Sequence, residues 1–289
     1  MNDNLPPRAA ARAVRTIVQR RAANFKYAFY RLPADQRAGM EAIYAFARRA
    51  DDAVDEAGTP AEKSARLAAF QRGFTATLSG APPDPPFVAL RWALDRFLIP
   101  AEPLMLILDG CARDLDNAHY GTFEEAYGYC YRVASAVGLA CLPVWGVRDP
   151  AARAPAEALG IGMQWVNVIR DCREDALNGR CYFPGEELAR AGLSADDFRA
   201  PPDTPEKAKA LRRFLLAQIA RAREFLKAGA ALLPLVPENS RHCPALLRAF
   251  YAELLRDIER DPLRVLHGRV RLGWMRKIAL FWRGGREAD

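Results

Sequence analysis

The sequence is poor in histidine, and its cysteines follow no pattern. The three histidines (His119, His242 and His267) lie far apart, so no pair has the spacing of a metal site. Six cysteines without a C-x-x-C pair indicate free, mostly buried thiols in a reducing compartment. A Walker loop, a nucleophile elbow and a complete G-x-G-x-x-G fingerprint are all missing, which argues against nucleotide binding and serine hydrolysis.

Long hydrophobic runs are also missing. The longest apolar stretch, Ala136 to Val147, is interrupted by Gly138 and Pro143. It is far shorter than the roughly 20 residues of a membrane-spanning helix. The basic N-terminal segment 1–21 contains no apolar stretch of signal-peptide length. We therefore expect a cytoplasmic protein that is neither exported nor membrane-spanning.

The charge balance is moderately basic and uneven. Of 289 residues, 51% are apolar and 27% charged, with 42 Lys and Arg against 35 Asp and Glu. This composition is typical of a globular protein with a large core. Seven basic residues and no acidic one lie between 264 and 286. Because the remainder is close to neutral, we expect no nucleic-acid partner.

Helical periodicity runs through nearly every long segment, and no convincing alternation of strand residues occurs. We expect helices at 9–23, 34–57, 61–79, 87–97, 101–119, 122–147, 151–176, 204–233 and 244–260. The breaks between them are rich in Gly and Pro, and none resembles a domain boundary. The fold class predicted is therefore all-α, with one domain over 1–289 that includes the N-terminal segment 1–21 and a basic, aromatic tail at 264–289. The glycines of Leu159-Gly-Ile-Gly-Met163 are interpreted as sites of close helix packing.

A first acidic stripe lies in the segment 44–55. Tyr44, Arg48, Asp51 and Asp55 follow at i, i+4, i+7 and i+11, which places them along one side of a helix. Apolar residues flank this stripe, so it borders the core of the protein.

A second stripe repeats the arrangement about 120 residues later. Gln164, Asn167, Asp171 and Asp175 follow at i, i+3, i+7 and i+11, again beside an apolar flank. A single stripe of this kind is more simply interpreted as a solvated acidic face. Two matched stripes, each with an arginine and an amide or phenol in register, favour a binding site.

The chemistry of these residues suits a hard cation. Like charges four residues apart repel one another, so stability alone does not explain them. Oxygen ligands without His or Cys are typical of Mg²⁺, which binds one or two carboxylates together with waters and substrate phosphates. Direct phosphate contacts are expected from Arg48, Arg170 and Arg180.

At this point the chain resembles the squalene/phytoene synthase family, the head-to-head prenyl diphosphate synthases. The first aspartate motif of the family matches Tyr44-Ala-Phe-Ala-Arg48 followed by Asp51-Asp-Ala-Val-Asp55. A middle signature matches 129–138, and the second aspartate motif matches 164–175 and continues to Arg180-x-Tyr182-x-Pro184. Three long motifs in the right order, over about 24–276, make the resemblance specific.

The resemblance implies an all-α isoprenoid synthase fold with a central cavity for two prenyl diphosphates. It implies Mg²⁺ ligands at Asp51, Asp55, Asn167, Asp171 and Asp175, and substrate binding by Arg48, Gln164, Arg170, Arg180 and Phe25. Tyr44, Tyr131 and Arg132 join the four aspartates as candidate catalytic residues. Aromatic faces such as those of Phe25, Phe29, Tyr44 and Trp165 are candidates for cation stabilisation, although core packing is the simpler interpretation of any single ring.

Within the family, the segments 114–125 and 257–277 look most like bacterial presqualene diphosphate synthases of the hopanoid type. We therefore expect two farnesyl diphosphates to be joined into presqualene diphosphate. Asn24 departs from the usual serine and resembles hydroxysqualene synthases instead. Phytoene synthesis from geranylgeranyl diphosphate, NADPH-dependent squalene synthesis and hydroxysqualene synthesis stay open as alternatives, as does a catalytically silent homologue that binds prenyl lipids.

The tail at 264–289 combines Trp274, Ile278, Phe281 and Trp282 with arginines and a lysine. This composition predicts either a solvated helix or peripheral contact with an anionic membrane surface, such as the inner membrane face. The membrane interpretation gains weight because an apolar product chain has to leave into lipid. The sequence leaves the oligomeric state open.

Overall fold

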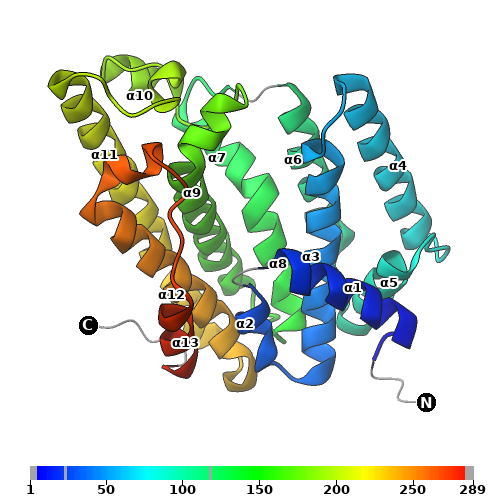
Figure 1. Cartoon of the computed structure of the whole chain (residues 1–289). Helices are drawn as coiled ribbons and strands as arrows, with labels where there is room; N and C mark the ends of the chain where they lie inside the picture. The colour runs from blue at the N-terminus through cyan, green and yellow to red at the C-terminus, as the bar shows by residue number, and fades with distance from the viewer. Residues whose placement is uncertain (1–4, 23–24, 117–118, 284–289) are drawn as a thin grey trace.

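The computed structural model describes residues 5–22, 25–116 and 119–283 (Figure 1). Within these ranges the chain forms helices and no strand; a single isolated bridge joins His119 and Cys181. The predicted all-α fold class is therefore confirmed. Asn24, whose identity bore on the choice of product, and the last six residues of the basic tail lie outside the described residues.

The first part of the chain packs around a long helix, α3 (Ala34–Asp55). α1 (Arg8–Arg21), α4 (Pro60–Leu78), α5 (Pro85–Phe97) and α6 (Ala101–Arg113) all contact α3, and the short α2 (Phe25–Tyr30) precedes it. The starts of α4 and α5 are fixed by Thr59 and Asp84, whose side chains accept from backbone N–H groups of the first turn, each with a proline directly after the cap.

The middle of the chain forms one nearly continuous helical rod. α7 (Phe123–Cys130) begins at a capping box made by Thr122 and Glu125. It passes through a π-helical turn (Tyr131–Ser135) into α8 (Ala136–Val144). The prediction of helix over 122–147 is thus confirmed in outline, but sequence periodicity gave no sign of the π turn.

The second long helix is α9 (Arg153–Leu177), which packs against the π turn, α8, α11 (Pro205–Ala228) and α12 (Glu238–Arg260). The predicted close packing of the glycines in 159–163 is confirmed. A Cβ atom on Gly160 would lie 2.5 Å from the Cα atom of Ser135, and one on Gly162 would lie 2.9 Å from the backbone nitrogen of Leu226. Glycine at these two positions lets neighbouring backbones approach α9.

Two short helices escaped the prediction, α2 and α10 (Gly185–Arg190), whereas α13 (Trp274–Trp282) lies in the tail for which a solvated helix was one of the two interpretations. Helices of six to nine residues show too few turns for a clear period. The predicted start of α12 at Pro244 is wrong, because the helix begins six residues earlier, at Glu238, and continues through the proline. Short 3₁₀ turns occupy 114–116, 150–152, 195–198, 229–235 and 262–266.

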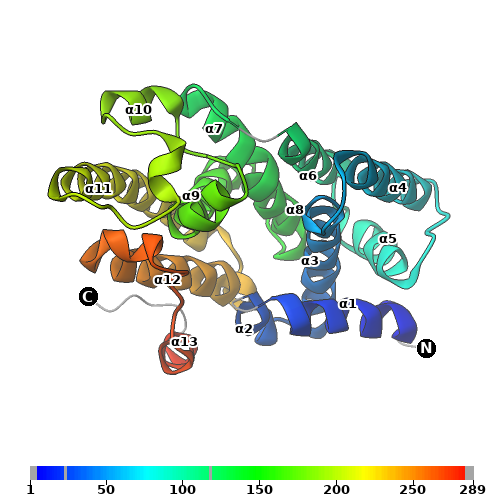
Figure 2. The ribbon, with the colours of Figure 1, turned by 45° about the horizontal axis from the view of Figure 1, so that its top comes forward.

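Five helices close into a ring. α3 contacts α8, α8 contacts α9, α9 contacts α12, α12 contacts α2, and α2 returns to α3. Figure 2 shows α9, α8 and α3 side by side with α12 and α2 across from them. No helix in the described ranges is both long and apolar enough to cross a bilayer. The ring positions the site described next.

Candidate active site

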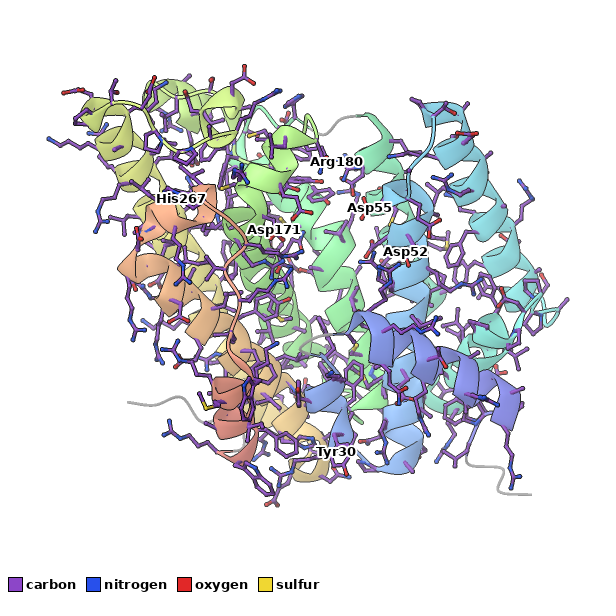
Figure 3. The ribbon with its side chains drawn as sticks, viewed as in Figure 1. Tyr30, Asp52, Asp55, Asp171, Arg180 and His267 are labelled. Atoms are coloured by element: carbon purple, nitrogen blue, oxygen red, sulfur yellow. The ribbon has the colours of Figure 1, made fainter. Side chains whose placement is uncertain are left out.

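The two acidic stripes meet at a polar mouth at one end of the ring, a cavity of about 260 Å³. Asp51 and Asp55 reach it from α3, and Asp171 and Asp175 reach it from α9. Figure 3 shows Asp55, Asp171 and Arg180 at this end of the molecule. Helical spacing had placed each pair on one side of its own helix, and the fold brings the two pairs to one cavity.

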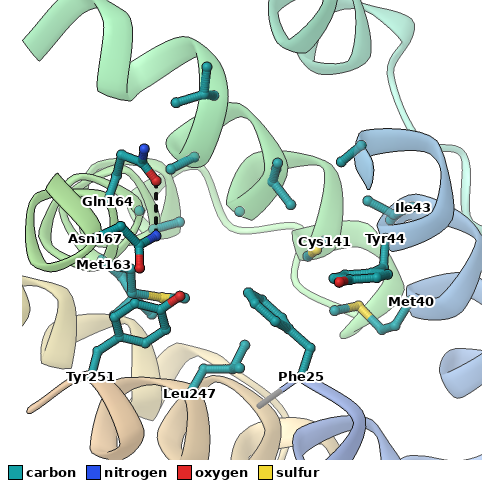
Figure 4. A pocket seen from close by; sticks show the side chains of 18 of the residues that line it. Phe25, Met40, Ile43, Tyr44, Cys141, Met163, Gln164, Asn167, Leu247 and Tyr251 are labelled. Atoms are coloured by element: carbon teal, nitrogen blue, oxygen red, sulfur yellow. Dashed lines mark hydrogen bonds between the residues drawn. The ribbon is translucent and has the colours of Figure 1, made fainter. Parts of the chain in front are cut away.

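Behind the mouth lies an apolar cavity of about 290 Å³ enclosed by the ring (Figure 4). Its walls carry apolar side chains from α2, α3, α8, α9 and α12, among them Phe25, Ile43 and Leu247. Four residues line both spaces: Asp51, Val133, Gln164 and Asn167. The polar mouth and the apolar cavity are therefore two ends of one binding space.

On α3, Tyr44 and Arg48 line the apolar cavity below Asp51. The ring of Tyr44 packs against Phe25 at 5.4 Å and Phe29 at 6.3 Å between centroids, and burial raises the pKa of its phenol to about 12. Arg48 donates to Asp52, one helical turn further along α3. Tyr44 is thus a neutral aromatic wall of the cavity.

Asp51 is partly buried on α3. Burial raises the pKa of its carboxyl to about 7, against the lowering effect of Arg48. The thiol of Cys111 donates to Oδ1 of Asp51 at 3.5 Å. A carboxylate in this environment lacks solvation, and a bound cation would supply the missing compensation.

On α9, two arginines hold Asp171. Arg170 donates to both of its carboxylate oxygens, and Arg269 approaches the same oxygens from the segment after α12, at 3.0 and 3.1 Å. Asp175, one turn further on, is less well compensated: burial, together with the neighbouring Asp171, raises its pKa to about 7. The α9 side of the mouth therefore combines fixed cations with a poorly paired carboxylate.

The donor set at the mouth fits a hard cation. Asn167 donates to Gln164 at 3.1 Å, and its own carbonyl oxygen is buried with no hydrogen-bond partner among the described residues (Figure 4). Such an orphaned acceptor beside two pairs of carboxylates suits Mg²⁺. In the described part of the chain, no three His, Cys, Asp or Glu side chains converge closely enough to hold a metal by themselves.

Arg180 closes the mouth between the two stripes. It follows the end of α9 and donates from Nη1 to Oδ1 of Asp55 on α3 at 3.2 Å. The turn that places it is fixed by Gly179 at φ +75° and by a backbone bond from Arg180 to the carbonyl of Asp175. Its side chain is 17% exposed, so the guanidinium faces the mouth of the cavity.

Sequence reasoning missed a fifth carboxylate at the mouth. Asp114, just after α6, accepts from the hydroxyl of Tyr129 at 3.1 Å and from that of Tyr182 at 3.0 Å. Burial raises its pKa to about 6, against the lowering effect of Arg180. The three residues lie within segments that had matched the family, but only the fold shows that their side chains meet.

Arg269 and Tyr251 were also missed. Tyr251 lies on α12 and lines the apolar cavity beside Asn167 (Figure 4). Arg269 belongs to the acid-free basic tail, which had suggested a surface segment. Neither residue stands in a stripe with other polar side chains, so periodicity alone could not single them out.

Two candidate catalytic residues lie elsewhere. Tyr131 and Arg132 belong to the π turn, and neither lines the mouth or the apolar cavity. Arg132 turns away, donating to Asp109 on α6 at 2.5 Å and to the carbonyl of Gly128 at 2.6 Å. These two candidates came from the resemblance to the family, which does not give the direction of a side chain within the π turn.

Trp165, a candidate for cation stabilisation, is a core residue. It is fully buried, packs against Phe123 and Phe183, and donates to Gln218 at 3.3 Å. The six cysteines are free and buried, as predicted. Burial raises the pKa of the Cys130 and Cys172 thiols, so both remain protonated in the core.

The sequence of the chain is similar to known squalene and phytoene synthases over most of its length. The sequence model of squalene/phytoene synthases matches residues 18–276. A phytoene synthase of Mycobacterium tuberculosis is 34% identical over 270 residues, which cover 93% of this chain and 88% of the relative. A 15-cis-phytoene synthase of Synechococcus elongatus is 33% identical over 277 residues, covering 91% and 88%.

Solved structures that are similar to this chain include synthases of related prenyl products. A dehydrosqualene synthase in complex with a ligand superimposes with a TM-score of 0.84 at 27% identity, covering 95% of both chains. A squalene synthase from Alicyclobacillus acidocaldarius superimposes with a TM-score of 0.79 at 26% identity, covering 90% of this chain and 95% of the other. The expected isoprenoid synthase fold is therefore confirmed.

Proposed function

The chain belongs to the squalene/phytoene synthase family of head-to-head prenyltransferases, and on this premise we propose that it joins two farnesyl diphosphates into presqualene diphosphate, with Mg²⁺ as its cofactor. The observation that carries the proposal is the continuity of the two cavities. A polar mouth lined by five aspartates and two arginines opens into an apolar space inside the ring. Such a space matches a molecule with a diphosphate at one end and a hydrocarbon chain at the other.

At the mouth, the residues divide into metal ligands and direct diphosphate contacts. Asp51 and Asp55 on α3, with Asn167, Asp171 and Asp175 on α9, are the proposed Mg²⁺ ligands. When bound, Mg²⁺ neutralises the diphosphate oxygens and so favours departure of the leaving group.

Arg170 and Arg180, both of which line the mouth, are the proposed direct contacts to the diphosphate, together with Arg48 from the cavity wall. Gln164 bridges the two cavities and accepts from Asn167, so we assign it to orienting that ligand and the substrate.

In the apolar cavity, the walls protect a reactive carbocation. Cleavage of the C–O bond of one farnesyl diphosphate releases diphosphate and leaves an allylic cation. The double bond of the second molecule attacks this cation, and loss of one proton closes the cyclopropane of presqualene diphosphate. Phe25, Phe29 and Tyr44 line this space, where they exclude water and stabilise positive charge.

The farnesyl assignment rests on the segments 114–125 and 257–277 and gains support from the dehydrosqualene and squalene synthases among the structural relatives. A second candidate is phytoene synthesis from geranylgeranyl diphosphate. It is favoured by the phytoene synthases that are 32–34% identical to this chain. The two candidates differ in chain length and share the proposed site.

Product analysis tests the proposal. Purified protein with Mg²⁺ would receive farnesyl or geranylgeranyl diphosphate, each with and without NADPH, and the extract would be analysed by mass spectrometry. We expect presqualene diphosphate from farnesyl diphosphate, unchanged by NADPH. Squalene that forms only with NADPH, hydroxysqualene, or phytoene from the longer substrate would each replace the proposed product within the same family.

A silent homologue that binds prenyl lipids is the alternative from another functional class. Such a protein would give no product with either substrate. The paired carboxylates argue against it, because binding an apolar chain does not require them. A melting-temperature increase that needs Mg²⁺ and diphosphate together would identify a working site even before a product is found.

A further inference from the structure

Two segments free of acidic residues lie at opposite ends of the chain and meet in the fold. Residues 4–34 contain seven basic residues and no acidic one, and residues 264–283 contain six basic residues and no acidic one. α1 and α2 belong to the first segment and α13 to the second. Their side chains line one surface groove of about 680 Å³, with Lys26, Tyr30 and Phe281 among its walls.

α13 presents an exposed apolar face at this groove, and two residues of that face, Ile278 and Trp282, also line the groove. Trp274, Met275, Ile278 and Trp282 are 68%, 69%, 40% and 77% exposed, although they are large and apolar. Their spacing of i, i+1, i+4 and i+8 confines them to an arc of about 100° on the helix. Leu280, 4% exposed, holds the opposite side of α13 against the protein. The exposed face is thus a regular feature of an amphipathic helix.

Positive charge borders this apolar face. Lys277 lies next to Met275 and Ile278 on α13, and burial, together with repulsion from Lys26 and Arg271, lowers its pKa. Arg31 lies over the ring of Phe281 at 5.8 Å, and Tyr30 on α2, 69% exposed, packs against the same ring at 6.3 Å. Exposed tryptophan and tyrosine beside clustered Lys and Arg are typical of a surface that binds anionic lipid headgroups.

The groove adjoins the apolar cavity. Phe29 lines both spaces and is therefore a shared wall between them. Figure 3 shows Tyr30, at the groove, at the end of the molecule away from Asp55 and Arg180 at the polar mouth. The hydrocarbon end of the binding space thus faces the groove, whereas the diphosphate end faces away from it.

We propose that α13 and α2 seat the protein on an anionic membrane and that the groove behind Phe29 is the exit route by which the hydrocarbon chains of the prenyl product reach the bilayer, while the diphosphate that this product retains stays at the polar mouth. The exit route rests on the proposed prenyltransferase function, whereas membrane binding does not. This orientation keeps the charged mouth in water, where substrates with a diphosphate group arrive, and turns the apolar end toward lipid.

Vesicle flotation tests the membrane contact. Phosphatidylcholine vesicles with and without phosphatidylglycerol would be mixed with the full chain and with the double variant Trp274→Ser/Trp282→Ser. We expect the wild type to float with the anionic vesicles at low salt, and the double variant to bind them about tenfold more weakly or worse. Leu98→Ser/Met105→Ser is the matched control, because these residues are 67% and 58% exposed on another part of the surface.

A second measurement follows the tryptophans themselves. Of the five tryptophans, Trp145 and Trp165 are buried at 3% and 0% exposure, and Trp92 is half-buried on α5, outside the proposed membrane surface. Lipid carrying bromine in its acyl chains should therefore quench mainly Trp274 and Trp282. A wild type that stays with the soluble fraction, or a double variant that floats equally well, would overturn the membrane contact. The membrane contact would also be overturned if the same substitutions dissociated a dimer of this chain and that dimer did not bind vesicles.

Kinetics separate the exit route from membrane binding. Anionic vesicles should raise steady-state turnover of the wild type, leave its single-turnover rate unchanged, and have no effect on the double variant. Binding without any effect on turnover would remove the exit route and keep the contact. A protein that forms no product from any prenyl diphosphate yet still floats would refute the proposed function and not the membrane surface.

Discussion

Arg180 and Asp55 lie 125 residues apart in the sequence and pair across the mouth of the cavity, at 3.2 Å between Nη1 and Oδ1. This ion pair connects the turn after α9 with the end of α3, so the guanidinium of Arg180 lies between the two acidic helices. A guanidinium in this position can exchange its carboxylate partner for a diphosphate without leaving the mouth.

Replacing Arg180 by glutamine should therefore weaken substrate binding. We expect kcat/KM for the prenyl diphosphate to fall by about tenfold to 10²-fold, the range for one lost charge-assisted hydrogen bond. Steady-state kinetics would measure the effect, with Arg190→Gln as the control. Arg190 pairs with Glu186 on the surface, at 70% exposure, and its loss should leave kcat/KM unchanged. Equal effects of the two substitutions would contradict a direct role for Arg180.

Asp51→Asn and Asp171→Asn should each abolish turnover without unfolding the protein. Each substitution removes one proposed Mg²⁺ ligand, and losses of about 10²–10³-fold or more are expected when such electrostatic stabilisation is removed. For Asp51 the melting temperature at pH 8 should not fall, because burial already disfavours its charged form. The exposed Asp95→Asn provides a control. Normal activity in either site variant would count strongly against the proposed metal site.

The sequence predicted the site to the extent that the site follows helical spacing. The stripes Tyr44/Arg48/Asp51 and Asn167/Asp171/Asp175 each lie on one helix, and an α-helix fixes the relative direction of residues three, four and seven positions apart. The apolar flanks of both stripes also indicated correctly that they border the core. For these residues, knowledge of the helix was enough to place the side chains.

Contacts between separate elements could not be predicted in this way. Asp114 is interpretable only once Tyr129 and Tyr182 are seen to converge on it from two other segments. Arg132, a catalytic candidate by resemblance, pairs with Asp109 on α6, and no sequence motif shows this contact between two elements. Arg269 reaches Asp171 through an irregular segment for which the sequence provides no geometry at all.

Asp114→Asn should destabilise the protein. The two carboxylate oxygens accept one phenolic hydrogen bond each, from Tyr129 and Tyr182, and asparagine retains only one acceptor oxygen. A buried hydroxyl left without its acceptor costs about 1–3 kcal/mol of folding free energy. Denaturant unfolding would measure the loss. Combining Asp114→Asn with Tyr129→Phe should give less than the sum of the two effects, because both changes break the same hydrogen bond.

The control for this prediction is Asp109→Asn. Asp109 pairs with Arg132 but is 51% exposed, so its loss should change the stability by less than about 0.5 kcal/mol. Additive effects of Asp114→Asn and Tyr129→Phe would show that the carboxylate does not hold the tyrosine.

Glu41 should make the stability of the protein depend on pH. Its side chain is almost fully buried on α3, and the nearest cation, Arg15, lies 3.8 Å away with 57% of its side chain exposed. Burial raises the pKa of Glu41 above 4.5, against the lowering effects of Arg15 and Arg37. A raised pKa in the folded state favours the protonated form of Glu41. The contribution of this proton to the stability of the fold is therefore complete below the pKa of Glu41 in the unfolded chain, and it is lost as the pH rises through the pKa in the folded protein.

Glu41→Gln should therefore raise the melting temperature relative to the wild type at pH 8 and leave it almost unchanged at pH 4. Thermal unfolding over this range would measure the difference. Glu62 offers a contrast, because hydrogen bonds from Thr59 lower its pKa, and its stabilising effect is lost as the pH falls. A Glu41→Gln variant that melts below the wild type at pH 8 would mean that the pairing with Arg15 outweighs the cost of burial.

Gly160→Ala should damage both stability and activity through the π turn. A methyl group at this position would meet the Cα and N atoms of Ser135 at 2.5 and 2.7 Å, and backbone atoms cannot move aside as a flexible side chain can. Ser135 is buried and donates to the carbonyl of Glu157 at 2.8 Å, so α9 and the π turn would have to separate. Overpacking of this kind costs about 1–3 kcal/mol. Val133 in the same turn lines both cavities, and turnover should fall as well.

Gly273→Ala is the control, because a methyl group there meets no atom within 4 Å. Denaturant unfolding and steady-state kinetics would be measured for both variants. If Gly160→Ala had the same stability and turnover as Gly273→Ala, the packing of α9 would not depend on its close approach to the π turn.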